Sequence, residues 1–236
     1  MTEHDNRIEY AAKHTEILRP PKQSLSTFGA TNVYYYLVTE PAYPELTGDA
    51  GSGETVVREG RVIAERPRIV TPYYLSRLEG FSSEAKRYFT LLTQAYGHDS
   101  PGLFYAYRNE PKELNIISDS WLAVVNRINE KIDQHGDPLA SIIKGEDDLW
   151  DVSLLKFIYE ITRRSLETNL TQLGNKGLLN VDSSGLPLDA RLRIEELFRQ
   201  VTKGERDPKE LKSELDRWNV YDEYEDRFLA IFRKRQ

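Results

Sequence analysis

The spacing of apolar residues changes near residue 118, and this change limits the folds that are open to the chain. Before it, apolar residues come in short runs broken by turn-forming residues, as in residues 32–39, a pattern typical of short strands. After it, apolar residues recur every three or four positions, as in residues 121–132, which is typical of amphipathic helices. The sequence therefore predicts a strand-rich part at residues 30–117 and a helical part at residues 118–236.

The strand-rich part contains five short apolar segments and one helical pattern. Glu59-Gly60 has the composition of a tight hairpin turn, and the stretch from Asn109 to Lys112 has that of a second turn. The expected strands span residues 32–39, 55–58, 61–70, 103–108 and 113–117, and the inserted helix spans residues 81–97. Strands joined by short turns pair antiparallel, so we expect an α+β fold with a small, mostly antiparallel sheet.

The helical part contains five to six amphipathic segments, several of which begin or end at a recognisable cap. The expected helices span residues 118–136, 137–145, 149–174, 188–204, 207–218 and 220–235. Residues 1–29 are expected to form an N-terminal arm. No flexible linker separates the two parts, so we expect the helical part to pack on the sheet in one contiguous body.

Composition excludes several kinds of chemistry. The 236 residues include no cysteine, which excludes disulfides, thiolate metal sites and cysteine nucleophiles. No run approaches the roughly 18 apolar residues of a membrane-spanning helix, and the N-terminus lacks the pattern of a signal peptide. We therefore expect a cytoplasmic protein without a membrane partner. The formal net charge of −6 argues against a nucleic-acid partner.

Three motifs that resemble reactive or ligand-binding sites are explained more simply by local structure. The glycine-rich stretch 48–55 lacks the lysine of a phosphate-binding loop and precedes a strand rather than a helix. His98, Asp99 and Ser100 are the residue types of a hydrolase triad, but immediate neighbours in a loop do not converge as a triad must. The acidic run at 146–151 suits the first turn of a helix. The sequence thus predicts no catalytic residue, metal site or cofactor.

Three consecutive tyrosines, Tyr34, Tyr35 and Tyr36, lie in the first strand. Because side chains alternate along a strand, Tyr34 and Tyr36 share one face and Tyr35 lies on the other. The same alternation over 61–70 puts Arg66 and Arg68 on one face. Tyrosine joins an apolar ring to a polar tip, and arginine binds anions and stacks on rings, so both suit recognition. The candidate ligand-binding residues are Tyr34, Tyr36, Arg66, Arg68, Tyr105 and Tyr107.

A purely structural role for the tyrosines is the alternative. Tyrosine forms strands well, and the helical part needs a surface on which to pack. If the helices cover Tyr34 and Tyr36, both are core residues and the strand is buried on both faces.

The sequence leaves three functions open. The first is a non-catalytic interaction protein that binds another protein or a second copy of itself. The second is an enzyme on a phosphorylated or nucleotide-like substrate, with Arg66 and Arg68 holding the anion and His98 or Asp99 as acid or base. The third is a nucleic-acid binder, which requires a basic surface despite the net charge.

Overall fold

The computed structural model describes residues 3–41, 53–71, 74, 94, 102–182 and 186–233. Its strands and helices confirm the α+β class expected from the sequence. The chain forms two compact units, of which the first comprises Met1–Arg66 and Tyr105–Asn169, and the second Pro67–Phe104 and Leu170–Gln236. Each unit contains both strands and helices, so the two units do not correspond to a strand-rich part and a helical part divided at residue 118.

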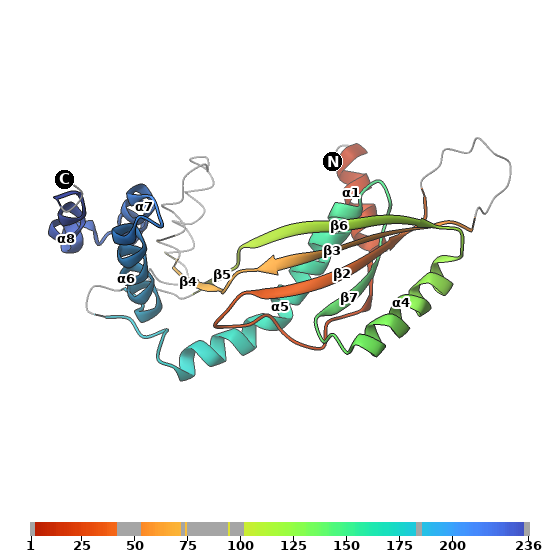
Figure 1. The fold of residues 1–236 in the computed structure, drawn as a ribbon, viewed down its shortest axis with the longest axis horizontal. Helices are drawn as coiled ribbons and strands as arrows, with labels where there is room; N and C mark the ends of the chain where they lie inside the picture. The colour runs from red at the N-terminus through yellow and green to blue at the C-terminus, as the bar shows by residue number, and fades with distance from the viewer. Residues whose placement is uncertain are drawn as a thin grey trace. The chain divides into compact units, whose positions relative to one another are not determined.

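The first unit is built on a five-stranded mixed sheet (Figure 1). Its strands are β1 (Glu16–Arg19), β2 (Thr31–Thr39), β3 (Thr55–Ala64), β6 (Tyr107–Ile117) and β7 (Ala140–Lys144). They lie in the order β1-β7-β2-β3-β6, and all neighbours are antiparallel except β2 and β7. The sheet is thus mostly antiparallel, as the sequence predicts.

The continuous strand β3 replaces the hairpin expected at Glu59-Gly60. It pairs with β2 along its whole length on one edge and with β6 on the other. Both edges are therefore hydrogen-bonded through the expected turn, and this pairing outweighs the local turn preference. The prediction of two strands in this segment was wrong.

The continuous strand β6 replaces the second expected hairpin. Its register with β3 shifts at one point, where Glu59 faces Glu113 but Gly60 faces Pro111. The extra residue, Lys112, makes a β-bulge at a proline, which has no N–H to donate to the ladder. A proline is tolerated at this position because β6 is the last strand in the sheet order.

The strand β7 takes the place of the helix expected at residues 137–145. Ile142 and Ile143 are both fully buried, and β7 pairs with β1 on one side and with β2 on the other. A continuous apolar run of this length also fits an interior strand, which buries both faces. The expected arm likewise contributes to the sheet, because its residues include β1 after the helix α1 (Glu3–His14).

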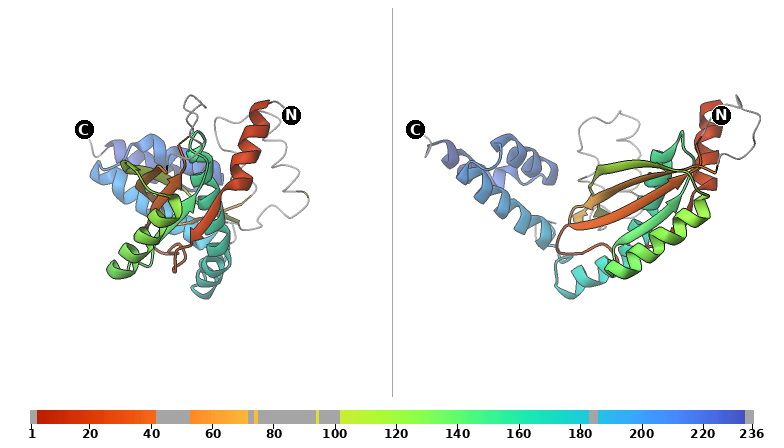
Figure 2. Two further views of the ribbon diagram at one scale, coloured as in Figure 1. Left: turned by 90° about the vertical axis from the view of Figure 1, so that its right-hand side faces the viewer. Right: turned by 45° about the vertical axis from the view of Figure 1, so that its right-hand side comes forward.

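Two helices cover the two faces of the sheet (Figure 2). On one face, α4 (Trp121–His135) buries Val124, Val125, Ile128 and Ile132 against residues that include Val38 and Val57. On the other face, α5 (Trp150–Asn175) packs Leu154, Phe157 and Ile161 against residues that include Val33 and Tyr35. The helical spacing in both segments thus predicted the faces that are buried.

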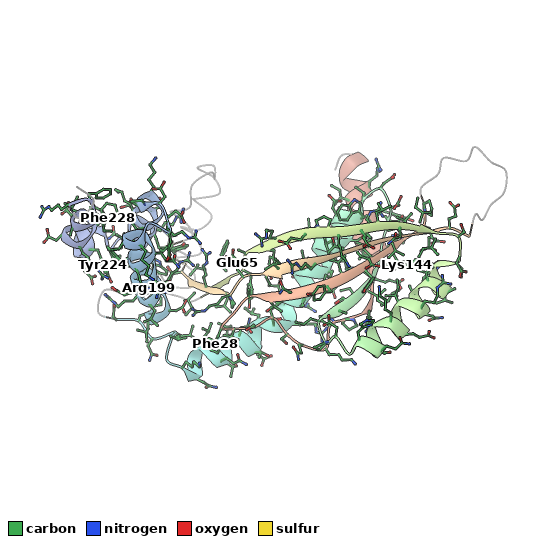
Figure 3. The ribbon with its side chains drawn as sticks, in the orientation of Figure 1. Phe28, Glu65, Lys144, Arg199, Tyr224 and Phe228 are labelled. Atoms are coloured by element: carbon green, nitrogen blue, oxygen red, sulfur yellow. The ribbon has the colours of Figure 1, made fainter. Side chains whose placement is uncertain are left out.

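The second unit contains β4 (Arg68–Val70) and β5 (Gly102–Phe104), which pair antiparallel. Three helices follow: α6 (Leu188–Lys203), α7 (Pro208–Trp218) and α8 (Tyr221–Arg233). Asp207 caps α7 as expected, and Gly204 and Asn219 end α6 and α7 in the left-handed conformation. In Figure 3, Tyr224 and Phe228 lie on α8, whose buried residues pack in one core with those of α6 and α7.

Some expectations concern residues outside the described part of the chain. Of the helix expected at 81–97, only Gln94 is described, and His98, Asp99 and Ser100 lie outside it. Most of the glycine-rich stretch 48–55 lies outside it as well. Among the described helices, none combines the length and the apolar character needed to cross a membrane.

Candidate binding site on the sheet

The three consecutive tyrosines of β2 have different environments. Tyr35 is 1% exposed in the core beneath α5, whereas Tyr34 on the opposite face is 41% exposed. Tyr36 is half-buried against the core beneath α4, with the ammonium of Lys131 5.4 Å from its ring centroid. One face of β2 is therefore sealed, while α4 covers the other face only in part and leaves Tyr34 open.

The uncovered part of this face contains a cavity of about 390 Å³. It is lined by Tyr34 and Tyr36 of β2, Glu59 and Arg61 of β3, and Glu110 and Lys112 of β6. We call it the sheet cavity. Three neighbouring strands supply its walls, so the backbone hydrogen bonds of the sheet determine the spacing of its side chains.

Gly60 and Tyr35 form the floor of the sheet cavity. The two residues are register partners, and a Cβ on Gly60 would lie 2.6 Å from Cζ of Tyr35 and 2.8 Å from the carbonyl oxygen of Glu110. Only glycine leaves room for the phenol to pass beneath β3, where its hydroxyl donates to Oδ1 of Asn109 on β6 at 3.0 Å. Burial raises the pKa of the Tyr35 phenol, which favours the protonated donor.

The charged walls of the sheet cavity are matched. Nε and Nη2 of Arg61 lie 2.7 and 2.6 Å from Oε2 of Glu110, its register partner on β6. This hydrogen bonding to Glu110 raises the pKa of Arg61, with a smaller contribution from the Tyr34 hydroxyl. Nζ of Lys131 on α4 lies 3.9 Å from Oε1 of Glu59. The cavity thus offers aromatic and hydrogen-bonding surface without a net charge on its paired walls.

The structure places the other predicted site residues elsewhere. Tyr105 and Tyr107 pack in the core beneath α5, where the Tyr105 hydroxyl accepts from Nδ2 of Asn169 at 3.0 Å and the Tyr107 hydroxyl bonds that of Thr162. Burial raises the pKa of both phenols. Arg66 is exposed at the end of the first unit, and Arg68 belongs to β4 of the second unit.

Arg61 and Glu110 are the site residues that sequence reasoning missed. The expected turn at Glu59-Gly60 interrupted the alternation that would have put Arg61 opposite Tyr34. A single strand over 55–64 would have predicted this neighbour correctly, because residues in register share a face.

The remaining motifs make structural contacts in the described part of the chain. In the acidic run, Asp147 pairs with Arg58 at 2.7 Å and Asp148 with Arg7 at 3.6 Å. The ring nitrogens of His14 and His135 bond backbone carbonyls of their own helices. The described residues contain no group of three or more side chains arranged to hold a metal ion.

Comparisons with known proteins add no family to this geometry. No family model, curated protein or solved structure matches the chain. The function of the sheet cavity must therefore be argued from its own residues.

Proposed function

We propose that the chain is a non-catalytic binding protein and that another protein docks at the sheet cavity. The observation that carries this proposal is the exposed ring of Tyr34 beside Arg61 over a floor built by Gly60 and Tyr35. Tyrosine and arginine are among the residue types that contribute most of the binding energy at protein interfaces. Because three paired strands hold these side chains, little conformational entropy is lost when a partner binds.

The matched charges favour a protein partner over a free anion. Arg61 is already bonded to Glu110, and Glu59 and Glu110 would repel a phosphate at the same place. An enzyme on a phosphorylated substrate and a nucleic-acid binder both need an excess of positive charge. The sheet cavity therefore supports these two alternatives less well than it supports protein binding.

The partner is either a different protein or a second copy of this chain. We also propose that the protein acts in the cytoplasm, where the absence of cysteine fits a reducing environment.

Affinity capture with the purified chain and quantitative mass spectrometry tests the proposal. Proteins that bind the wild type are identified first, and their affinities are then measured with purified components. Tyr34→Ala is expected to weaken the main interaction by about 30-fold or more, as truncation of a central aromatic residue does. Arg61→Ala is expected to weaken it as well.

The matched control is Tyr10→Ala, which removes a tyrosine of α1 that is 54% exposed. It should leave the interaction unchanged. Sedimentation at increasing concentration shows whether the partner is a second copy. If Tyr34→Ala binds every partner as tightly as the wild type does, docking at the sheet cavity is wrong.

A further inference from the structure

A second cavity, of about 500 Å³, lies in the second unit among β4, α6 and α7. Five basic and three acidic side chains line it among the described residues. The basic residues are Arg68, Arg193, Arg206, Lys209 and Arg217. We call it the arginine cavity, and its excess of positive charge is unexpected in a chain whose net charge is −6.

Two of the three acidic side chains are bonded to basic residues near the edge of this cavity. Glu196 lies 2.6 Å from Arg199, which does not line the cavity. Glu210 lies 2.9 Å from Arg206, and both side chains of this pair are about half exposed. The third acidic residue that lines the cavity is Glu214.

Glu214 is buried and shared between two guanidinium groups. Its oxygens accept from the Tyr74 hydroxyl at 3.1 Å and from Nε1 of Trp218 at 3.3 Å. They also lie 3.4 Å from Nε of Arg193 and 3.7 Å from Nη1 of Arg217. One buried carboxylate therefore faces two guanidinium groups, whose side chains are each 28% exposed.

Arg193 is one of the two arginines that pair with Glu214. Its Nε is buried and donates no hydrogen bond to the described residues. Burial lowers the pKa of Arg193, and repulsion from Arg68 lowers it further. Attraction to Glu214 and Asp189 opposes this repulsion, and an anion bound beside Arg193 and Arg68 would reduce it further.

Other lining residues add donors to the same space. Lys209 lies in the first turn of α7, where the helix dipole disfavours a cation, so its position does not serve helix stability. Ser213 also lines the cavity and can donate a hydrogen bond, whereas Nε2 of Gln200 already donates to Oε1 of Glu196 at 2.8 Å.

We propose that the arginine cavity binds a phosphate dianion, either free phosphate or the phosphate of a monoester, between Arg193, Arg217 and Arg68. The buried Nε of Arg193 offers a donor to such an anion, and guanidinium groups bind phosphate oxygens in pairs. This site includes Arg68, one of the two arginines that the sequence suggested for an anion, but not Arg66. The inference does not depend on the sheet cavity, which belongs to the other unit.

Titration of the full chain followed by nuclear magnetic resonance tests the inference directly. The probes are inorganic phosphate, O-phosphoserine and acetate, each at constant ionic strength maintained with chloride. We expect the Nε–H resonance of Arg193 to shift in a saturable way with phosphate or phosphoserine. Acetate should bind about tenfold or more weakly, because it carries one charge. The tighter of the two phosphate probes identifies whether the phosphate is free or esterified.

Substitutions of lining residues test whether phosphate binds in the arginine cavity. Arg217→Gln should weaken phosphate binding about 10- to 100-fold, as loss of a charged hydrogen bond does. If this variant does not fold, Lys209→Gln and Lys212→Gln form a matched pair on the same helix, because only Lys209 lines the cavity. Lys209→Gln should weaken binding about two- to fivefold and Lys212→Gln should not. No saturable shift, acetate binding equal to that of phosphate, or equal effects of the two lysine variants would overturn the proposal.

Discussion

The acidic and basic side chains are balanced in the sheet cavity but not in the arginine cavity. In the sheet cavity, Arg61 and Glu110 are register partners on neighbouring strands, and each finds its counterion across the ladder. In the arginine cavity, two arginines from α6 and α7 meet at the single buried carboxylate of Glu214. The first cavity is charge-matched and aromatic, whereas the second has excess positive charge and few aromatic groups among its described lining residues.

This difference follows from how each scaffold places side chains. Strand pairing puts residues in fixed opposite pairs, so a charge on one strand meets a defined neighbour. Packed helices bring together residues that are distant in sequence, so several like charges can converge around one counterion. The sheet cavity is therefore suited to a partner with a neutral or mixed surface, and the arginine cavity to an anion.

The largest expected effect tests how far Glu214 compensates the charges of Arg193 and Arg217 in the arginine cavity. Glu214→Ala leaves Arg193 and Arg217 without their shared carboxylate, which should cost about 3–5 kcal/mol of stability in the second unit. Urea denaturation followed by Trp218 fluorescence measures it, since Trp218 donates to this carboxylate. If the cavity binds phosphate, added phosphate should stabilise the variant more than the wild type.

The matched change in the other cavity is Glu110→Ala. The side chains of Arg61 and Glu110 are 42% and 34% exposed, so water can replace the lost partner and the expected cost is within about 1 kcal/mol. Equal losses of stability in Glu214→Ala and Glu110→Ala would contradict the conclusion that only the arginine cavity depends on a buried counterion.

An effect between those of Glu214→Ala and Glu110→Ala is expected from filling the floor of the sheet cavity. Gly60→Ala places a Cβ against the Tyr35 ring and the Glu110 carbonyl, and should destabilise the first unit by about 1–3 kcal/mol. Gly53→Ala is the control, because nothing lies within 4 Å of the Cβ that it would add. Thermal denaturation measures both variants, and phosphate binding in the second unit should be unaffected by either. A Gly60→Ala protein as stable as the wild type would mean that the phenol does not need this glycine.

An effect smaller than that of Gly60→Ala is expected from removing the buried hydroxyl of Tyr35. Tyr35→Phe removes the hydrogen bond to Asn109 and should cost about 1 kcal/mol near neutral pH. Burial raises the folded-state pKa of Tyr35 above the ordinary value of 10.0, so the folded chain keeps a proton that the unfolded chain releases. The resulting stability is fully present below about pH 10 and is lost as the pH rises through the raised pKa.

Urea denaturation of the wild type and of Tyr35→Phe at pH values on both sides of 10 separates the two contributions. The decline of stability with rising pH should be shallower in the variant. The same slope in both proteins would contradict the burial of Tyr35 as its cause.

Much of the helical architecture could be predicted because its signals are local. The spacing of Val124, Val125, Ile128 and Ile132 identified the buried face of α4, and the Asp-Pro start identified the first turn of α7. The same Asp-Pro signal failed at residues 137–145, because pairing with β1 and β2 made that segment a strand. Capping residues indicate the conformation that a segment favours locally. The strands and helices that pair with the segment determine whether it adopts that conformation.

The candidate sites were predicted less completely for the same reason. Tyr34 and Tyr36 could be placed on one face from alternation alone. Arg61 was missed because Glu59-Gly60 has the composition of a turn, whereas strand pairing makes the segment continuous. No pattern in the sequence predicts that Arg193 and Arg217 lie near Arg68.

The sequence by itself determined the α+β class, the positions of α4 to α8, the absence of cysteine chemistry and the alternation of the three tyrosines. These properties depend on composition and on periodicities within a few turns of one segment. Only the tertiary structure decided which tyrosine is open, that Gly60 lies over Tyr35, and that Glu214 is shared by two arginines. Each of those depends on pairing or packing between residues far apart in the chain, for which local patterns contain no information.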